Sequence, residues 1–450
     1  MNNERLPLWR KIGYGMGDAG ANFCWTFIAA FIMIYCTNTL GVSAAVIGSL
    51  MMFSKILDGV SDVVMGRIID RTHSKLGKAR FWYLVSILPL AIFTFLIFNV
   101  PTSLSDNGKC WYVFIMYTVV GAVFYTANNV AYSSMTALCT KDPEDRVQMG
   151  SYRFVCAIAA VLIISSFTTG LVEKFGGGQQ GWTAVSLIYA IVTAVCLLIP
   201  FFSVKELPQD DTAEETKKQE KGEIFKDLAC LVKNKYFILI LIMYICMYIM
   251  SGVMSGMGVY FATYQLKDAS LLGVLNMANR FPFIVALPLV PYITAKFGMR
   301  KSIILGDAFG IIGSVLIIAG GLTANFPMIL VGFVIRTVGT SPQTGALNAL
   351  IAETDEYSFL KFGRRMTGTI YSCSSMGIKI GTGIGVALCG FLLDFSGFDG
   401  MATEQAASAI TAINWSYLLG VALLPVISII IFSLLNVEKA NEKLRNEMNA

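Results

Sequence analysis

Two carboxylates lie four residues apart in a segment whose remaining composition is that of a membrane-spanning helix. Asp58 and Asp62 stand with Lys55 at positions i, i+3 and i+7, so the three side chains share one face of a helix expected over residues 43–69. Two carboxylates so near to one another in surroundings of low dielectric constant resist being ionised together. They can bind a cation, hold a proton or pair with a base such as Lys55, and oxygen ligands suit a hard cation such as Na⁺. The spacing therefore indicates a site that couples ion binding to another event.

A structural salt bridge is the alternative for this pair. Lys55 and Arg71 would then neutralise the carboxylates at the end of the helix that precedes the basic run DRTHSKLGKAR. Asp58 lies more than two turns inside the helix, where an ionisable group is costly and marks a functional site. We therefore take Asp58 and Asp62 as the candidate cation-binding residues, and as Na⁺ ligands if the protein is sodium-coupled.

The composition places the chain in a bilayer. Of its 450 residues, 55% are hydrophobic and 14% charged, whereas soluble domains carry about a quarter charged residues. The net charge of +5 is explained by loop charges that set membrane orientation, so nucleic acid is not an expected partner. No CxxC pattern, nucleophile–base pair or metal-ligand constellation occurs, so neither an enzyme nor a cofactor other than a coupling ion, Na⁺ or H⁺, is indicated. No obligate protein partner is evident.

Apolar runs long enough to cross about 30 Å of hydrocarbon recur along the chain. The one long polar segment has the mixed charges of a solvated linker over 205–235, with an amphipathic helix expected near 223–233. It separates two groups of six spans, and the basic turns KLGKAR and KFGMRK follow the second span of each group, which fits the parallel repeats of major facilitator transporters. We expect an all-α membrane protein with six-helix bundles over 1–204 and 236–450. The twelve spans are expected at 12–38, 43–69, 82–100, 111–138, 153–173, 182–204, 236–264, 269–296, 302–321, 326–351, 367–393 and 410–436.

Basic residues are distributed unequally between the two sides of this arrangement. The connections on one side, together with both ends of the chain, carry most of the Lys and Arg residues, and the opposite connections carry only Lys109, Lys174 and Lys267. This is the positive-inside pattern. We therefore expect a multi-pass protein of the cell (inner) membrane with both termini in the cytoplasm.

Further ionisable groups lie inside the expected spans. Lys379 stands within consecutive GxxxG spacings over 377–385, which allow close helix approach, and we expect it to face a carboxylate in the other half. The alternative is a lysine that extends to the cytoplasmic edge. Arg280, beside Pro282 in mid-span, can meet an anionic or polyhydroxyl substrate unless that span is misplaced.

Asp307 and Arg336 are interpreted as lying near cytoplasmic helix ends, where a structural role is the simpler explanation. Arg336 is nevertheless kept with Lys55 and Arg280 as a candidate for coupling or gating.

The first and fourth spans combine aromatic rings with polar side chains. Sugar hydroxyls take hydrogen bonds and the C–H face of a sugar ring stacks on an aromatic ring, so this combination suits a sugar; ordinary interhelical hydrogen bonding is the alternative. The residues concerned are Asp18, Asn22, Trp25, Tyr125 and Asn129.

Five stretches resemble the glycoside–pentoside–hexuronide:cation symporters, a major facilitator family whose best-known member is the melibiose permease. The D-x-x-x-D helix followed by D-R-T-x-S-K-x-G-K is the most specific of these features, and the resemblance covers essentially the whole chain. The stretches are YGMGDAGANF, KILDGVSDVVMGRIIDRTHSKLGKAR, NNVAYSSM, DPEDRVQMGSYRF and KFGRRMTGTIYSCSSMGIKIG.

The resemblance implies a twelve-helix major facilitator fold and symport of a glycoside or related sugar with Na⁺, H⁺ or Li⁺. The two second-helix carboxylates of the family's cation site match Asp58 and Asp62, and its fourth-helix threonine matches Thr126. The essential lysine of the eleventh helix matches Lys379, and the arginine at the start of the fifth helix matches Arg153.

Several positions depart from the family pattern. An amide next to the second carboxylate of the cation site is replaced by Ser61. The carboxylates and the tryptophan with which the melibiose permease binds galactosides match Asn22, Asn129 and Ser133, which argues against galactoside specificity. Members for pentosides and glucuronides read G-D-x-x-x-N in the first helix, as this chain does.

We expect a secondary transporter that moves a sugar or glycoside (a pentoside, hexoside or glucuronide) inward with Na⁺ or H⁺ by alternating access. The alternatives are a major facilitator transporter of an amphipathic lipid or drug, and a membrane sensor that does not transport. The expected cation site is Asp58, Asp62, Ser61 and Thr126, and the expected substrate site is Asp18, Asn22, Trp25, Tyr125, Asn129, Arg153, Ser375 and Lys379.

Overall fold

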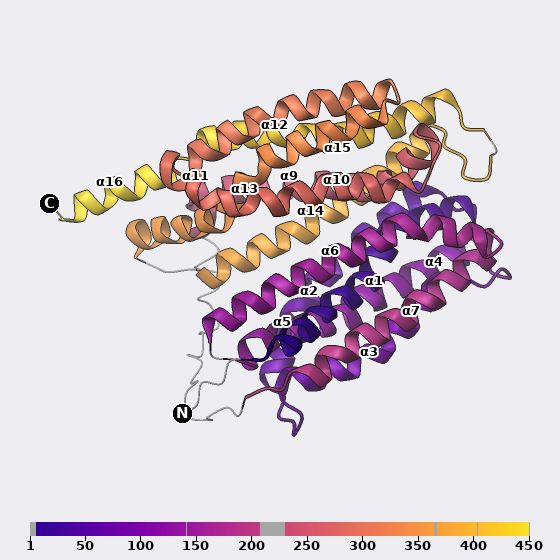
Figure 1. The fold of residues 1–450 in the computed structure, drawn as a ribbon, viewed down its shortest axis with the longest axis horizontal. Coiled ribbons are helices and arrows are strands. Elements are labelled where there is room, and N and C mark those ends of the chain that lie inside the picture. The colour runs from indigo at the N-terminus through magenta and orange to yellow at the C-terminus, as the bar shows by residue number, and fades with distance from the viewer. Residues whose placement is uncertain (1–5, 141, 208–229, 364–366, 403, 450) are drawn as a thin grey trace. The chain divides into compact units, whose positions relative to one another are not determined.

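The computed structural model describes residues 6–140, 142–207, 230–363, 367–402 and 404–449, and all the regular secondary structure in these ranges is helical (Figure 1). The elements are α1 (Leu8–Asn38), α2 (Ala44–Asp70), α3 (Lys78–Ile97), α4 (Asp106–Thr118), the π-helical η1 (Val119–Tyr125), α5 (Thr126–Leu138), α6 (Pro143–Lys174), α7 (Gly178–Ser203), α9 (Lys235–Tyr260), the π-helical η2 (Phe261–Gln265), α10 (Leu271–Ala286), the 3₁₀ turn η3 (Leu287–Leu289), α11 (Val290–Phe297), α12 (Met299–Leu322), α13 (Phe326–Phe362), α14 (Thr367–Phe395), α15 (Ala407–Leu434) and α16 (Val437–Asn449).

Helices occupy all twelve segments predicted to span the membrane, which confirms an all-α membrane protein. Within the described ranges, ten helical stretches are long and apolar enough to cross a bilayer, and α10 with α11, which meet at a 60° bend, make an eleventh. The helix α13 is not among them. Arg336 lies ten residues inside α13, so the prediction that it lies near a helix end is wrong.

The described residues pack into two compact units. Unit 1 is formed by the described parts of Met1–Gln209, Ser255–Asn276 and Val386–Ile413, and unit 2 by those of Asp210–Met254, Met277–Gly385 and Asn414–Ala450. The predicted division of the chain into residues 1–204, 205–235 and 236–450 stays a prediction. Most of the predicted amphipathic helix at 223–233 lies outside the described residues, and only 230–233 are seen as helix.

Unit 1 is organised around α1, which packs along both α6 and α7. Small residues on α1 make this possible, because a Cβ at Gly15 would lie 2.9 Å from the backbone of Tyr152 and one at Gly20 would lie 3.0 Å from Leu197 N. Figure 1 shows these helices running along one another in the indigo-to-magenta part of the chain. The close packing holds polar residues of α1 at fixed positions against their neighbours.

The segments of unit 1 that come from the second half of the chain attach to the end of α1. The Thr37 and Tyr260 hydroxyl oxygens lie 2.8 Å apart, and Asn38 donates to the Tyr264 hydroxyl at 2.7 Å. The Phe398 ring packs edge-on against both tyrosines, with ring centroids 5.3 and 5.4 Å away. Hydrogen bonds and aromatic contacts therefore close unit 1 at this end of α1.

Unit 2 is built on two close helix pairs. Along α12 and α13, a Cβ at Gly339 would lie 2.6 Å from the backbone of both Gly306 and Gly310. On α14, a Cβ at Gly381 would lie 2.7 Å from Ile245 O of α9, which confirms that the predicted GxxxG spacing brings two helices together. The residue Lys379 is carried on this glycine-rich helix.

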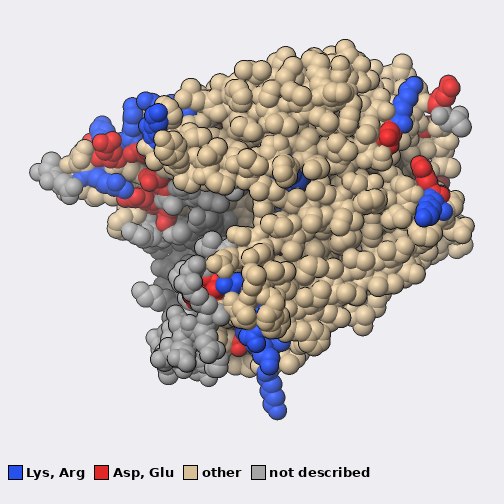
Figure 2. Space-filling model, in the orientation of Figure 1, with Lys and Arg blue, Asp and Glu red and all other residues tan. Residues whose placement is uncertain are grey.

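The charged side chains lie mainly at the helix ends. On the face drawn in Figure 2, Lys, Arg, Asp and Glu gather there, and uncharged residues cover the helix middles apart from one small blue area. Leu88, Ile191 and Val315 are examples of exposed apolar side chains on membrane-spanning helices, at 65%, 57% and 58% exposure. Such exposure of large apolar residues fits a lipid-facing surface.

Candidate functional site

The π-helical turn η1 lies directly before Thr126 in the fourth span. A π-helical turn carries an extra residue, so it rotates the helix that follows, and such turns recur at functional sites. The Thr126 hydroxyl oxygen lies 3.2 Å from Gly121 O, five residues back, inside this turn. A Cβ at Gly121 would lie 3.3 Å from the Trp25 ring, so the glycine lets α1 approach η1. The turn thus positions Thr126 toward α2.

Thr126 connects the two carboxylates of α2. Its Oγ1 lies 2.9 Å from Asp58 Oδ1 and 3.0 Å from Asp62 Oδ1. The Ser61 hydroxyl lies 2.9 Å from Asp58 O and 3.3 Å from Thr126 Oγ1. Asp58 and Thr126 are buried, at 5% and 2% exposure. A hydroxyl carries one proton, so Thr126 cannot donate to both carboxylates at once.

Lys55 completes this cluster from the preceding turn of α2. Its Nζ lies 3.2 Å from Asp58 Oδ2 and 3.7 Å from the centroid of the Trp25 ring. The Trp25 ring in turn contacts the Tyr125 ring at a centroid distance of 5.0 Å. The ammonium group is thereby held between a carboxylate and an aromatic face, both of which stabilise a positive charge.

The cluster of Asp58, Asp62, Thr126 and Ser61 offers only oxygen atoms to a ligand. Two carboxylates and hydroxyls suit a small hard cation or a shared proton. In the described part of the chain, no group of three or more His, Cys, Asp or Glu residues is placed to hold a metal ion. The chemistry that this cluster supports is reversible binding of a monovalent cation in competition with Lys55.

Asp18 and Arg153, both predicted to contact substrate, form an ion pair between α1 and α6. Arg153 Nε lies 2.6 Å from Asp18 Oδ2, and the guanidinium lies 4.4 Å from the Tyr132 ring centroid. The two side chains are about one-fifth exposed, at 19% and 22%. Each residue neutralises the charge of the other. Substrate contact with either residue must therefore keep this ion pair intact or take its place.

The predicted substrate residues differ in whether their polar groups already form hydrogen bonds within the protein, as a comparison of Asn22 with Tyr125 and Asn129 shows. Asn22 donates to Asp18 O at 2.8 Å and accepts from the Thr26 hydroxyl at 2.8 Å. Within the described ranges, no hydrogen bond is found for the Tyr125 hydroxyl or the half-buried Asn129 amide. These two residues are therefore better placed than Asn22 to bind a ligand hydroxyl.

The remaining predicted residues lie in unit 2 and are placed there individually. Ser375 is exposed and Lys379 is half-buried on α14. Arg280 is exposed on α10, although it lies inside a membrane span, and no ion pair with it is found among the described residues. Arg336 of α13 is buried and donates to Asn279 Oδ1 at 3.4 Å. These positions keep all four residues as candidates.

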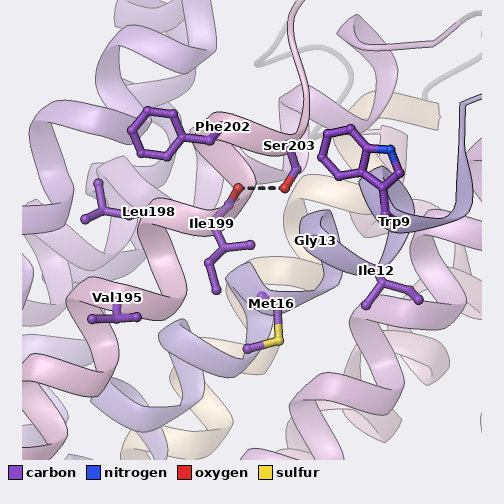
Figure 3. A pocket seen from close by; sticks show the side chains of 9 residues that line it. All are labelled: Trp9, Ile12, Gly13, Met16, Val195, Leu198, Ile199, Phe202 and Ser203. Atoms are coloured by element: carbon purple, nitrogen blue, oxygen red, sulfur yellow. Dashed lines mark hydrogen bonds between the residues drawn. The ribbon is translucent and has the colours of Figure 1, made fainter.

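A groove of about 680 Å³ between α1 and α7 lies apart from this cluster (Figure 3). Figure 3 shows Trp9, Ile12 and Phe202 around it, and these side chains are 59%, 42% and 73% exposed. The Ser203 hydroxyl donates to Ile199 O at 2.7 Å. The lining is otherwise apolar, so this groove lacks the polar groups that a sugar requires.

Solved structures of transporters share the fold. The nucleoside transporter NupG aligns with a TM-score of 0.64 over 95% of this chain and 99% of that chain, at 14% identity. A bacterial homologue of the human lysosomal transporter Spinster, in an inward-facing and unoccupied conformation, aligns with a TM-score of 0.67 over 97% of both chains, at 13% identity. The protein therefore has the major facilitator fold, as predicted, and is a multi-pass membrane protein.

The family follows from the sequence match. The family model for MFS/sugar transport proteins matches residues 13–439, so the chain belongs to this family. Its relatives include the isoprimeverose transporter of Lactiplantibacillus pentosus, 28% identical over 93% of this chain and 86% of that protein, and the glucuronide carrier protein homologue of Escherichia coli strain K12, 29% identical over 88% and 85%. The putative glycoside/cation symporter YagG of the same strain is 28% identical over 91% and 88%. The protein is a transporter rather than an enzyme, and the resemblance to the glycoside–pentoside–hexuronide:cation symporters is confirmed.

Proposed function

We propose that this protein is a secondary active transporter that carries a sugar or glycoside across the cell (inner) membrane together with Na⁺ or H⁺. The observation that carries the proposal is the position of Thr126 between the carboxylates of Asp58 and Asp62, with Oγ1 at 2.9 and 3.0 Å. The Asp58 side chain is buried and that of Asp62 is half-buried, and two carboxylates this close to one another resist being ionised together, which a bound cation or an added proton relieves. This makes their charge state depend on the coupling ion.

The cation reaches this cluster in competition with Lys55. Lys55 neutralises one Asp58 oxygen at 3.2 Å when the cluster holds no other cation. A bound Na⁺ ion, or a proton on either carboxylate, weakens this contact and leaves the ammonium group against Trp25. Trp25 contacts the ring of Tyr125, a candidate sugar-binding residue. A change in the contact between Lys55 and Trp25 can therefore affect Tyr125 through this ring contact. Ion and sugar then favour the same state, and their coupling is reciprocal.

The substrate that fits best is a glycoside, a pentoside or a hexuronide. Trp25 and Tyr125 supply aromatic faces, and Asn129 supplies an amide with no partner in the described ranges. The relatives include an isoprimeverose transporter and a glucuronide carrier homologue, so both a neutral pentoside and an anionic sugar are candidate substrates. In unit 2, Lys379 stays a predicted substrate-binding residue and Arg280 a predicted coupling or gating residue.

Transport proceeds by alternating access of two six-helix halves, with both termini in the cytoplasm. One positive charge that moves inward across about 100 mV supplies about 2.3 kcal/mol. At about 1.4 kcal/mol per tenfold change, this supports roughly 50-fold accumulation of substrate. A chemical gradient of the same ion adds to this driving force.

Uptake into proteoliposomes tests this function directly. A panel of labelled neutral pentosides, hexosides and glucuronides is offered under an imposed inward Na⁺ gradient, and then under an inward H⁺ gradient at equal Na⁺. Accumulation of one sugar above equilibrium under one gradient supports the proposal and identifies both ligands. Flux of amphipathic lipids or drugs without sugar dependence, or tight sugar binding without any flux, would replace it by a lipid or drug transporter or by a sensor.

A further inference from the structure

A second cluster of buried polar residues lies in unit 2. Asp307 of α12 accepts a short hydrogen bond from the Ser428 hydroxyl of α15. Arg336 of α13 interacts electrostatically with Asp307 and with Tyr417 of α15. Arg336 also donates to Asn279 Oδ1 of α10 at 3.4 Å. The cluster therefore connects four helices of one unit.

Burial makes the charges of this cluster costly. Asp307 is 0% exposed and Arg336 is 7% exposed. The two helices that carry these residues pack closely, because a Cβ at Gly310 would lie 3.4 Å from Arg336 O and one at Gly306 would lie 3.1 Å from Pro342. A charge in such surroundings requires either a partner for each polar atom or neutralisation.

The polar atoms of this cluster are only partly satisfied. Among the described residues, neither Asp307 Oδ1 nor Arg336 Nε has a hydrogen-bond partner, although both atoms are buried. No direct ion pair between Asp307 and Arg336 is formed in the described structure. The aspartate thus has one oxygen bonded to Ser428 and a second oxygen that lacks a donor. A proton on Oδ1 removes the uncompensated charge of that oxygen.

The surroundings of Asp307 suit a proton better than a metal cation. Among the described residues, Arg336 on α13 is the charged group that acts on Asp307, and α15 contributes the Ser428 hydroxyl. Tyr417 interacts electrostatically with Arg336, and among the described residues no charged group of α10 or α11 is found to act on the carboxylate. A Na⁺ ion would meet one carboxylate and a nearby guanidinium that repels it. A proton needs only the free Oδ1.

We propose that Asp307 is a second, separate ion-binding site of this transporter and that the ion is a proton. Proton transfer from a hydronium ion to Oδ1 forms an O–H bond and releases water, without electron transfer. The neutral carboxyl group no longer compensates Arg336, whose charge must then be met by Asn279 and by Tyr417. Asn279 lies on α10, which meets α11 at a bend. Protonation of Asp307 therefore changes the strength of the hydrogen bond by which Arg336 of α13 contacts α10.

Infrared difference spectroscopy on the purified full-length protein, without any sugar, tests this site independently of transport. Spectra are recorded between about pH 6 and about pH 9, a range in which exposed carboxyl groups with ordinary pKa values of about 4 stay ionised, for the wild type, for Asp307→Asn and for the double variant Asp58→Asn, Asp62→Asn. The probe is the carbonyl stretch of a protonated carboxylic acid, which shifts in heavy water. We expect one such band to persist in the double variant and to be lost in Asp307→Asn.

A second variant that keeps the Asp307 carboxyl group distinguishes loss of the proton site from a folding defect in Asp307→Asn. Ser428→Ala removes the hydroxyl that donates to Asp307 Oδ2, so we expect the same band to remain but to move to higher frequency, as the carbonyl loses its hydrogen bond. A band that is unchanged in both Asp307→Asn and Ser428→Ala, or a double variant with no band of a protonated carboxylic acid, overturns the proposal. None of these results depends on which sugar is carried, so a failure here leaves the proposed symport untouched.

Discussion

The ammonium group of Lys55 lies 3.2 Å from the carboxylate of Asp58, one helical turn away on α2. The contact is buried, with side-chain exposures of 11% and 8%. A cation that binds at Asp58 must therefore displace the Lys55 ammonium group from this carboxylate or weaken the contact between them. This arrangement makes Lys55 a competitor for the coupling ion.

Removal of this competitor should strengthen cation binding. We expect Lys55→Met to lower the concentration of coupling ion that gives half-maximal uptake by about tenfold, because a like charge beside the carboxylates is lost. Ion-dependent sugar uptake at fixed sugar concentration measures this value. Lys55→Arg keeps the positive charge and serves as the matched control, with a value near that of the wild type. A raised half-saturating concentration in Lys55→Met would contradict the competition.

The ion pair between Asp18 and Arg153 predicts that a single substitution destabilises the protein more than a double substitution does. Arg153→Gln alone leaves the carboxylate without its 2.6 Å partner, and we expect a loss of about 1–3 kcal/mol in the free energy of unfolding, moderated by partial exposure. The double variant Asp18→Asn, Arg153→Gln should recover most of this loss. Thermal unfolding of the detergent-solubilised variants, read as a double-mutant cycle, gives the interaction energy.

Sugar affinity separates a structural from a substrate role for the same pair. If Arg153 also contacts substrate, the double variant should regain thermal stability but not sugar affinity. Full recovery of both in the double variant would show that the pair only holds α1 against α6.

The carboxylate of Glu206 caps the start of α3. It accepts hydrogen bonds from the backbone N–H groups of Lys78, Ala79 and Arg80 at 2.9, 2.9 and 2.7 Å. A carboxylate at a helix N-terminus satisfies unpaired donors and interacts favourably with the helix dipole. We expect Glu206→Ala to cost about 0.5–2 kcal/mol of stability, measured by thermal unfolding. Glu173→Ala, which removes an exposed carboxylate near the end of α6, is the matched control and should unfold like the wild type.

The close contact of α12 with α13 predicts a strict requirement for glycine. A Cβ at Gly339 would lie 2.6 Å from backbone atoms of α12, which cannot move aside as a flexible side chain can. Gly339→Ala should therefore lower stability by about 1–3 kcal/mol. Gly170 of α6 has no atom within 4 Å of an added Cβ, so Gly170→Ala is the control and should be tolerated. Equal melting temperatures for the two variants would refute the packing argument.

The helices and the importance of Asp58 and Asp62 could be predicted because hydropathy and intramembrane charge are local properties of the sequence. The role of Thr126 was implied only by family resemblance, since a threonine within an apolar span carries no signal of its own. The π-helical turn before it was missed, because VVGAVFY contains no proline and its residue types do not mark a change of helix type.

Partnerships between distant residues were not predictable in the same way. Asp18 and Arg153 are separated by 135 positions, and a single sequence shows each of them only as a charge in or near a span. Asp307 and Arg336 were interpreted as structural charges near helix ends, yet the fold places Arg336 mid-helix beside Asp307 and leaves one buried polar atom of each without a partner among the described residues. Such pairings arise from helix packing, which composition and periodicity do not specify.

Binding of the coupling ion by Asp58, Asp62 and Thr126 can be tested by comparing two kinds of flux in one set of variants. Gradient-driven accumulation and equilibrium exchange of the same labelled sugar are measured in proteoliposomes for the wild type, Asp58→Asn, Asp62→Asn and Thr126→Ala. We predict that accumulation above equilibrium is lost in both aspartate variants and reduced by about tenfold in Thr126→Ala, whereas sugar exchange persists. Accumulation at the wild-type level in both aspartate variants would show that Asp58 and Asp62 do not bind the coupling ion and that the pair is structural.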